Sequence, residues 1–84
     1  MEQKIWKLQI GSWGKIKNVE DNGRGIGTRL HELGFVEGDM VMPALRSPFG
    51  DPIAYQIRGA LIALRREDAD LITVETIEPE DMGI

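Results

Sequence analysis

The clearest alternation of apolar and polar positions lies in the segment 53–58. Ile53, Tyr55 and Ile57 fall on one side of an extended chain and the residues between them on the other, because successive side chains of a strand point to opposite faces. Gly59 then precedes an apolar run over residues 60–64. A glycine between two such runs is typical of a tight hairpin turn. The pattern therefore predicts two antiparallel strands joined at Gly59.

A different period governs residues 24–33. Ile26, Leu30 and Leu33 are spaced i, i+4 and i+7, which places them on one stripe of a helix. Asn22 is the expected N-cap, because its side chain can accept a hydrogen bond from a free N–H group of the first turn. The sequence thus predicts a helix over residues 24–33 with one apolar face.

The two ends of this helix differ in strength. Gly34 follows the last apolar position, where a glycine in the left-handed conformation often ends a helix, and Phe35 follows it, where an apolar side chain packs back on the last turn. Gly25 and Gly27 each weaken the helix by about 1 kcal/mol relative to alanine. We expect a sharp C-terminal end and an irregular first turn.

Short apolar segments separated by polar turns make up the rest of the chain. They predict strands at 14–19, 40–45 and 71–76, one helical turn at 65–70, and either a strand or a helical turn at 5–10. Pro43 cannot donate a ladder hydrogen bond, which places it on a sheet edge or at a bulge. Five short strands and one helix around a thin core predict a mainly β fold, a small partly open barrel that exposes few strand edges.

Length and composition are those of one small domain. The chain has 84 residues, no cysteine and one histidine, which excludes disulfides and cysteine-based zinc sites. We expect one domain over residues 1–76 and an acidic, frayed tail over 77–84. The longest aliphatic run, 60–64, is far below the roughly 20 residues that span a bilayer, and the N-terminus does not resemble a signal peptide. We therefore expect a soluble cytoplasmic protein.

The charge balance argues against nucleic acid as a partner. The net charge is −4, whereas binding to phosphate backbones needs a basic surface. Three of the acidic residues, Glu78, Glu80 and Asp81, lie in the tail, so the body of the domain is nearly neutral. The lack of a basic cluster in the sequence, more than the net charge, makes nucleic acid an unexpected partner.

Five sequence pieces in a fixed order resemble the ferrous iron transport protein A (FeoA) family of small bacterial proteins. They are I-x-x-L-x-x-G-x-x-G-x-I at 5–16, R-L-x-x-L-G-F-x-x-G at 29–38, P-F-G-D-P-I at 48–53, G-A-L-I-A-L-R at 59–65 and A-D-L-I-T-V at 69–74. The resemblance implies a small stand-alone domain with an SH3-like barrel. It also implies a role in ferrous iron uptake beside a membrane transporter that carries a cytoplasmic GTPase domain. It brings few fixed functional residues with it.

His31 is the strongest candidate for a metal ligand. It is expected on the helix next to Glu32, with Glu20 and Asp21 close in sequence. Iron(II) and similar ions accept imidazole together with carboxylate, so His31 and Glu32 form a candidate site for a weakly held divalent metal. The ordinary alternative is a solvated helix face. A single histidine makes an incomplete site, which a second copy of the chain could complete in a weak homo-oligomer.

Three aromatic residues are candidates for a partner interface. Trp13 lies between Ser12 and Gly14, and Phe49 lies at the expected tip of the loop 47–52. Trp6 is the third, because indole rings often anchor interfaces. Each has an ordinary alternative: the tryptophans can cover a thin core, and the prolines of the loop can simply stiffen it.

Two further segments are weaker candidates. The carboxylates Glu67, Asp68 and Asp70 could bind a hard cation, or favour the start of a helical turn. The segment 23–27, G-R-G-I-G, precedes the helix but lacks the spacing and the lysine of a phosphate-binding loop. No nucleophile with a partnering base is evident, so we expect no enzyme and no firmly bound cofactor.

The sequence thus supports one leading hypothesis and one alternative. The leading hypothesis is a non-enzymatic cytoplasmic accessory protein that docks on the cytoplasmic domain of a ferrous iron transporter and regulates it. The alternative is a divalent-metal-binding domain that senses or carries iron(II). The lack of cysteine thiolates favours the first, because it leaves few ligands with which to hold iron.

Overall fold

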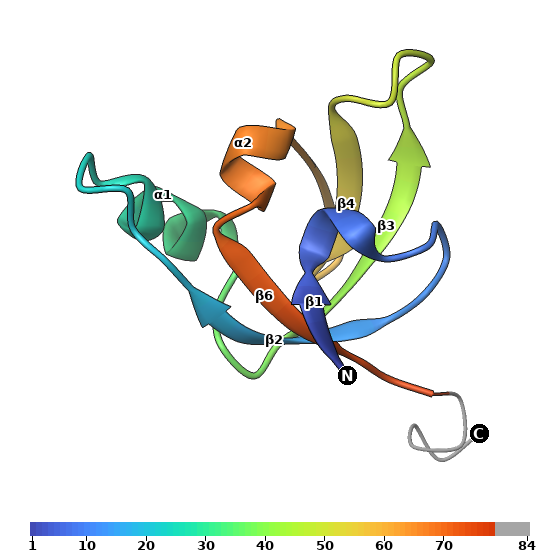
Figure 1. Ribbon diagram of the computed structural model, residues 1–84, viewed down its shortest axis with the longest axis horizontal. Coiled ribbons are helices and arrows are strands. Elements are labelled where there is room, and N and C mark those ends of the chain that lie inside the picture. The colour runs from blue at the N-terminus through green and yellow to red at the C-terminus, as the bar shows by residue number, and fades with distance from the viewer. Residues whose placement is uncertain (79–84) are drawn as a thin grey trace.

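The protein folds as a six-stranded antiparallel sheet with one main helix. The structure is a computed structural model and describes residues 1–78. The strands are β1 (Glu2–Lys4), β2 (Gly14–Val19), β3 (Met40–Arg46), β4 (Ile53–Ile57), β5 (Ala60–Leu64) and β6 (Ile72–Thr76). Their order in the sheet is β1-β6-β2-β3-β4-β5 (Figure 1). The predicted mainly β fold is confirmed, with one strand more than expected.

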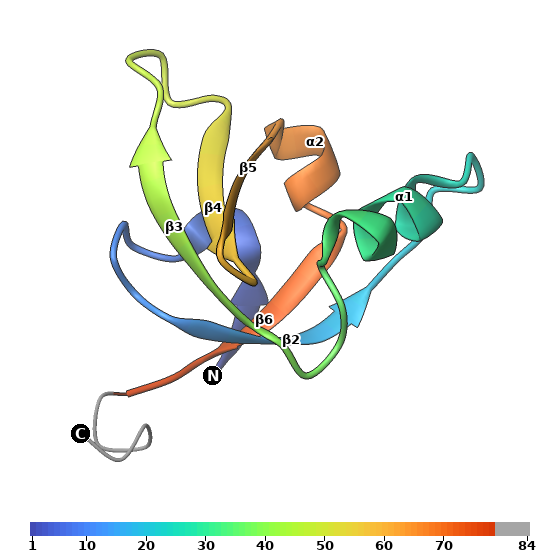
Figure 2. The ribbon, with the colours of Figure 1, turned by 180° about the vertical axis from the view of Figure 1, so that it is seen from behind.

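The sheet is bent but open. Register shifts interrupt the β2–β6 pairing between Ile16 and Asn18 and the β3–β4 pairing between Pro43 and Leu45. Such bulges bend a sheet and increase its twist. Figures 1 and 2 show the result, with β3 and β4 rising steeply from the level of β2 and β6. Because β3 lies between β2 and β4, Pro43 is at a bulge of an inner strand and not on an edge.

Strand β1 is the element that the sequence did not predict. Its three residues are polar, yet they pair with β6, with Gln3 opposite Val74. Gln3 also donates a side-chain hydrogen bond of 2.7 Å to the Thr76 hydroxyl. The chain then makes a short 3-10 turn, η1 (Ile5–Lys7), which is the helical alternative for this segment. The strand exists because β6 offers it an edge, which no local pattern reveals.

The core lies on the concave side of the sheet and draws on nearly every element. Phe35 and Tyr55 meet edge to face with ring centroids 6.3 Å apart, a favourable aromatic geometry. The buried apolar residues are Ile5, Leu8, Ile16, Leu30, Phe35, Val41, Ile53, Tyr55, Ile57, Leu64, Ala69, Ile72 and Val74. The face predicted to be shared by Ile53, Tyr55 and Ile57 is therefore confirmed, and it points into the core.

The main helix, α1 (Ile26–Leu33), begins later than predicted. The prediction of Asn22 as its N-cap is wrong, because the Asn22 side chain accepts a hydrogen bond from the Arg24 N–H group. Asp21 instead accepts one from the N–H of Gly27 at 3.0 Å. Gly25 precedes the helix with φ of 82°, a conformation that suits glycine. The glycines thus shorten the helix at its start.

The C-terminal end of α1 is as predicted. Gly34 has φ of 111°, and the N–H of Phe35 donates to the carbonyl of Leu30, the bond that closes a Schellman-type end. Leu33, however, is 37% exposed. Only Gly27 and Leu30 of the helix are fully buried, because α1 covers one end of the sheet rather than its centre (Figure 1).

The other predicted turns are also confirmed. Arg58 and Gly59 join β4 to β5 with positive φ at both positions, as a two-residue type I′ hairpin requires. A single helical turn, α2 (Arg66–Ala69), follows β5.

No helix among residues 1–78 is long and apolar enough to cross a membrane. The predicted frayed tail falls mostly on residues 79–84, outside the described part. Within that part, the N–H of Ile77 donates to the Trp13 carbonyl.

Candidate functional site

His31 lies on α1 and is held at both ring nitrogens. Nδ1 is 2.8 Å from the carbonyl oxygen of Gly27, and Nε2 is 2.7 Å from Oε1 of Glu37. Both partners accept, so a protonated ring can donate to both. The backbone bond to Gly27, followed by the bond to Glu37, raises the pKa of His31. The bond from His31 lowers the pKa of Glu37.

None of the acidic residues predicted to join His31 as metal ligands is paired with it among residues 1–78. Glu32 is exposed and pairs with no other described residue, while Glu20 lies 3.7 Å from the Lys4 ammonium. No group of three His, Asp or Glu side chains within residues 1–78 has a geometry suited to a metal ion. The two potential metal ligands that do meet are His31 and Glu37. The hydrogen bond between them uses the ring nitrogen and the carboxylate oxygen that would otherwise bind a metal. A site at His31 and Glu32 stays a prediction without a supporting geometry.

The weaker candidates have structural uses. Asp70 accepts a 2.7 Å hydrogen bond from the Trp6 indole, and the segment 23–27 forms the approach to α1. Asp51, from the loop between β3 and β4, accepts a bond from the Arg66 N–H at the start of α2. Asp70 and Asp51 therefore connect α2 to η1 and to the loop between β3 and β4.

Trp13 is half-buried beside a pocket of about 460 Å³. The pocket is lined by the segment before β2 together with Gln3, Lys7, Thr76 and Ile77. The Trp13 carbonyl also accepts the hydrogen bond from Ile77 that continues the chain beyond β6. Part of the indole surface is left open to solvent.

Phe49 has the most exposed large apolar side chain among residues 1–78. It is 96% exposed, at the tip of the loop between β3 and β4, where the N–H of Gly50 donates to the Ser47 carbonyl. This loop extends away from the body of the sheet (Figure 2). The ring makes no contribution to the core.

Trp6 lies on η1, packed against the edge of the core. The Arg66 guanidinium stacks over its ring at 3.7 Å from the centroid, and the Lys7 ammonium lies 5.3 Å away. Cation–π contacts of this kind fix the orientation of both partners. Trp6 thus ties η1 to α2 while one side of it borders a pocket.

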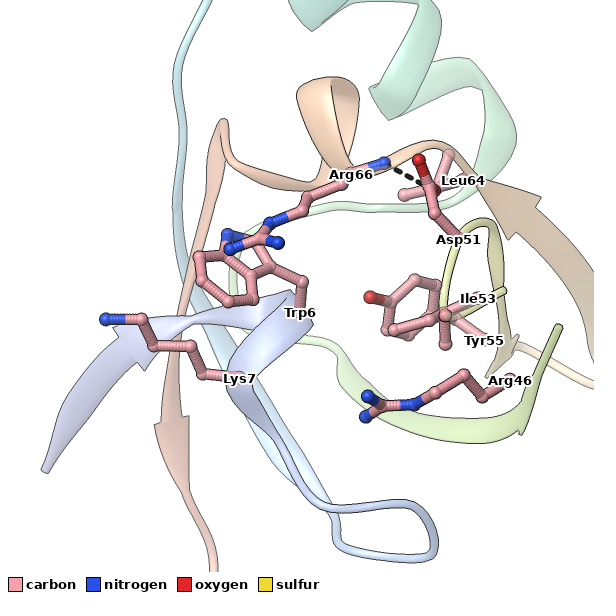
Figure 3. Close-up of a pocket in the computed structure, with 9 residues that line it drawn as sticks. Trp6, Lys7, Arg46, Asp51, Ile53, Tyr55, Leu64 and Arg66 are labelled. Atoms are coloured by element: carbon pink, nitrogen blue, oxygen red, sulfur yellow. Dashed lines mark hydrogen bonds between the residues drawn. The ribbon is translucent and has the colours of Figure 1, made fainter. Parts of the chain in front are cut away.

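That pocket has a volume of about 350 Å³ and joins three separate stretches of the chain, 6–7, 46–55 and 64–66 (Figure 3). It is lined by Trp6, Lys7, Arg46, Gly50, Asp51, Ile53, Tyr55, Leu64 and Arg66. The lining combines apolar side chains with three basic ones, Lys7, Arg46 and Arg66. Lys7 also lines the pocket beside Trp13, so the two hollows adjoin.

Tyr55 is the exceptional residue of this pocket. Its side chain is fully buried, and its hydroxyl has no hydrogen-bond partner among residues 1–78. In Figure 3 the hydroxyl points from β4 toward Trp6 and the basic side chains. Loss of hydration raises the pKa of Tyr55 to about 12, so the group stays a neutral donor. Buried polar groups without partners are uncommon and costly.

Little in the sequence indicated this site. Tyr55 was predicted to share one strand face with Ile53 and Ile57, where a hydroxyl among isoleucines was the available signal. Arg46 and Arg66 are 20 positions apart in the sequence, and no spacing rule connects them. The structure places neighbours of Phe49, namely Gly50 and Asp51, in the same pocket as Trp6, and it links this pocket to Trp13 through Lys7.

A family model for the FeoA domain matches residues 6–76. The chain belongs to the FeoA family. This confirms the resemblance stated from the sequence pieces, and the match covers every element from η1 to β6. The family is linked to ferrous iron transport by the relatives that it contains.

One such relative is the Fe(2+) transport protein A/Fe(2+) transporter FeoB fusion protein of Porphyromonas gingivalis. It is 39% identical over 75 residues, which cover 88% of this chain but only 9% of the fusion protein. In that protein a FeoA domain and a FeoB transporter are parts of one polypeptide. The chain described here therefore corresponds to a small part of that relative.

Solved structures of FeoA proteins share the fold. Iron(II) transport protein A of Clostridium thermocellum has a TM-score of 0.83 at 36% identity, and the match covers 89% of this chain and 46% of that one. FeoA of Stenotrophomonas maltophilia, solved with zinc, has a TM-score of 0.78 at 29% identity, covering 87% and 89%. The latter is described as a prokaryotic SH3 domain protein and a candidate activating factor of ferrous iron transport. The expected SH3-like fold is thereby confirmed.

Proposed function

We propose that this protein is a non-enzymatic cytoplasmic accessory of ferrous iron transport. It docks on the cytoplasmic, GTPase-containing domain of a FeoB-type transporter and regulates it. The observation that carries the proposal is the fusion of a related domain to the transporter in one polypeptide. Fusion holds two domains at high effective concentration, which is useful when the separate domains act together through a weak contact.

The surface around Trp6 and Phe49 supports docking. Phe49 exposes nearly its whole ring, and Trp6 offers a half-buried indole beside a pocket. Large aromatic side chains next to a hollow are typical of the residues that carry most of an interface's binding energy. A basic pocket is also a poor place for a cation, so this surface favours a protein partner over bound iron.

The docking test is a titration of the isotope-labelled protein with the transporter's GTPase-containing domain, followed by NMR. We expect saturable shifts at the Trp6 and Trp13 indoles and in the loop 47–52. Phe49→Ala should weaken binding several-fold. Leu61→Ala is the matched control, because Leu61 on β5 is 59% exposed but lies outside both pockets. The absence of any shift at high micromolar partner concentration would count strongly against docking.

The divalent-metal alternative has its own test. Anaerobic addition of iron(II) should selectively broaden the His31 resonances and those of its neighbours, and His31→Ala should abolish the effect. The His31–Glu37 bond of 2.7 Å must break before either group can bind a metal. A diffuse response over all acidic residues would eliminate this alternative.

A further inference from the structure

The pocket beside Trp6 combines two features that favour one kind of ligand, and the first is its unpaired positive charge. Lys7, Arg46 and Arg66 are exposed and stand at the same pocket. None of the three has an ion-pair partner within residues 1–78, although other basic residues, such as Lys17 and Arg58, do. The acidic residue of the pocket, Asp51, is engaged by the Arg66 N–H. The pocket therefore carries an excess of positive charge in a chain whose net charge is −4.

Tyr55 is the second and independent feature. Its hydroxyl is buried, lacks a partner in the described chain and points into this pocket (Figure 3). A buried donor without an acceptor is costly in the free protein, and a negatively charged oxygen is its best acceptor. The hydroxyl and the basic side chains thus favour the same type of group.

We infer that this pocket binds the carboxylate side chain of a glutamate or aspartate in a partner polypeptide. The carboxylate accepts a hydrogen bond from the Tyr55 hydroxyl and lies among Lys7, Arg46 and Arg66. This inference rests on the proposed docking function, because it names the chemical group through which the same surface recognises its partner.

The shape of the pocket favours a side chain over a free oxyanion. Its lining includes apolar side chains beside the polar ones, namely Ile53, Leu64 and Trp6. The methylene groups of a glutamate can pack there while its carboxylate meets the polar groups. A free phosphate would bury charge against the same apolar surface, and its second charge would be repelled by Asp51. A polypeptide can also contact Phe49, whose ring is almost fully exposed, and a free ion cannot.

Access to Tyr55 requires a small movement. The hydroxyl oxygen exposes less than 1 Å², so a ligand that reaches it must displace a side chain of the pocket wall. Arg46 is solvent-exposed and has no ion pair in the described chain, so it can move at little cost. Arg66 is held on the Trp6 ring and provides a fixed side of the site.

The first experiment uses a blocked peptide of alternating glycine and glutamate, titrated into the full-length labelled protein. We expect saturable shifts at the Trp6 indole and at the backbone amides of Asp51, Tyr55 and Arg66. The binding should weaken as salt rises from about 0.1 to 1 M, where the screening length falls from about 10 to 3 Å. The peptide with glutamine in place of glutamate should leave these resonances unchanged. Inorganic phosphate is the third probe.

The variants separate the Tyr55 hydroxyl from a general effect of charge. Tyr55→Phe should weaken peptide binding by roughly tenfold, since it removes one charge-assisted hydrogen bond. Arg46→Gln should weaken it by a similar factor. Ser47→Ala is the matched control: the Ser47 hydroxyl is also buried and without a partner, but it lies outside the pocket. This variant should bind the peptide as the original chain does.

The outcomes distinguish the inference from the function on which it rests. Equal binding by Tyr55→Phe and the original chain, or equal binding of the glutamine peptide, overturns the carboxylate pocket. Tighter binding of phosphate than of the glutamate peptide overturns the assignment to a polypeptide. If the transporter domain binds Tyr55→Phe as tightly as the original chain, docking holds and the pocket assignment fails. If the transporter domain does not bind at all while the peptide does, the pocket assignment holds and the proposed partner is wrong.

Discussion

The end of the molecule around α1 and the pocket beside Trp6 use polar side chains in opposite ways. Around α1, polar groups at both ends of the helix have partners within the chain: His31 bonds at both nitrogens, and Asp21 accepts a hydrogen bond from the Gly27 N–H. Arg58 likewise donates to Asp39 at 2.7 Å. These contacts stabilise the turns at either end of a short helix that has little buried surface of its own.

The pocket lacks this internal pairing. Its basic side chains have no carboxylate partner among residues 1–78, and the Tyr55 hydroxyl has no acceptor there. A polar group whose hydrogen bonds are made within the chain stabilises the fold. A polar group that lines a pocket and lacks a hydrogen-bond partner is available to a ligand. Tyr55, and not His31, therefore has a polar group without a partner in the described chain, which a ligand can bind.

The largest effect is expected at the end of α1. Gly34→Ala should reduce the free energy of unfolding by about 1–2 kcal/mol, because residue 34 has φ of 111° and a Cβ atom is disfavoured in that region. Chemical denaturation measures the change. Glu32→Ala, an exposed change two residues earlier, is the control and should lie within about 0.5 kcal/mol of the original chain. A harmless Gly34→Ala would mean that the helix end is less fixed than its hydrogen bonds indicate.

An effect of opposite sign is expected in the pocket. Tyr55→Phe should stabilise the free protein by about 1 kcal/mol, since it removes a buried hydroxyl that has no partner in the described chain. Thermal unfolding should show a midpoint higher by roughly 4–8 °C. Ser47→Ala tests the same physical cause outside the pocket. Destabilisation by Tyr55→Phe would show that the hydroxyl already has a strong partner in the free protein.

The smallest effect is the pH dependence of the His31–Glu37 pair. Its raised pKa means that His31 contributes stability fully below 6.5, and this contribution is lost as pH rises through the native pKa. The lowered pKa of Glu37 adds stability above 4.5. The pair should therefore contribute most between pH 4.5 and 6.5. Both side chains are well exposed, so solvent screening limits the contribution to about 0.5 kcal/mol.

Two measurements check this expectation. NMR titration should place the His31 pKa above 6.5, and Glu37→Gln should lower it. The difference in unfolding free energy between the original chain and His31→Gln should shrink from pH 6 to pH 8. A difference that grows with pH would contradict the assigned hydrogen bonds.

Local sequence patterns predicted the elements whose causes are local. Alternation placed Ile53, Tyr55 and Ile57 on one face of a strand, and Gly34 with Phe35 predicted the end of a helix. The order and spacing of five short pieces along the chain were enough to state the family, because these pieces mark turns and core positions of one architecture. Local pattern failed at Asn22, since a competing bond to Arg24 and the flexible glycines moved the helix start to Ile26.

The pairing of β1 and the composition of the pocket depend on long-range contacts that no local pattern contains. Glu2–Lys4 is a strand because β6 presents unpaired backbone groups to it, and its polar sequence carries no sign of this. Trp6, Arg46, Tyr55 and Arg66 meet because the sheet bends at its bulges and brings η1 and α2 over β4. Hydrophobic period reports which way a side chain points, but the partner it meets depends on contacts between segments far apart in the chain.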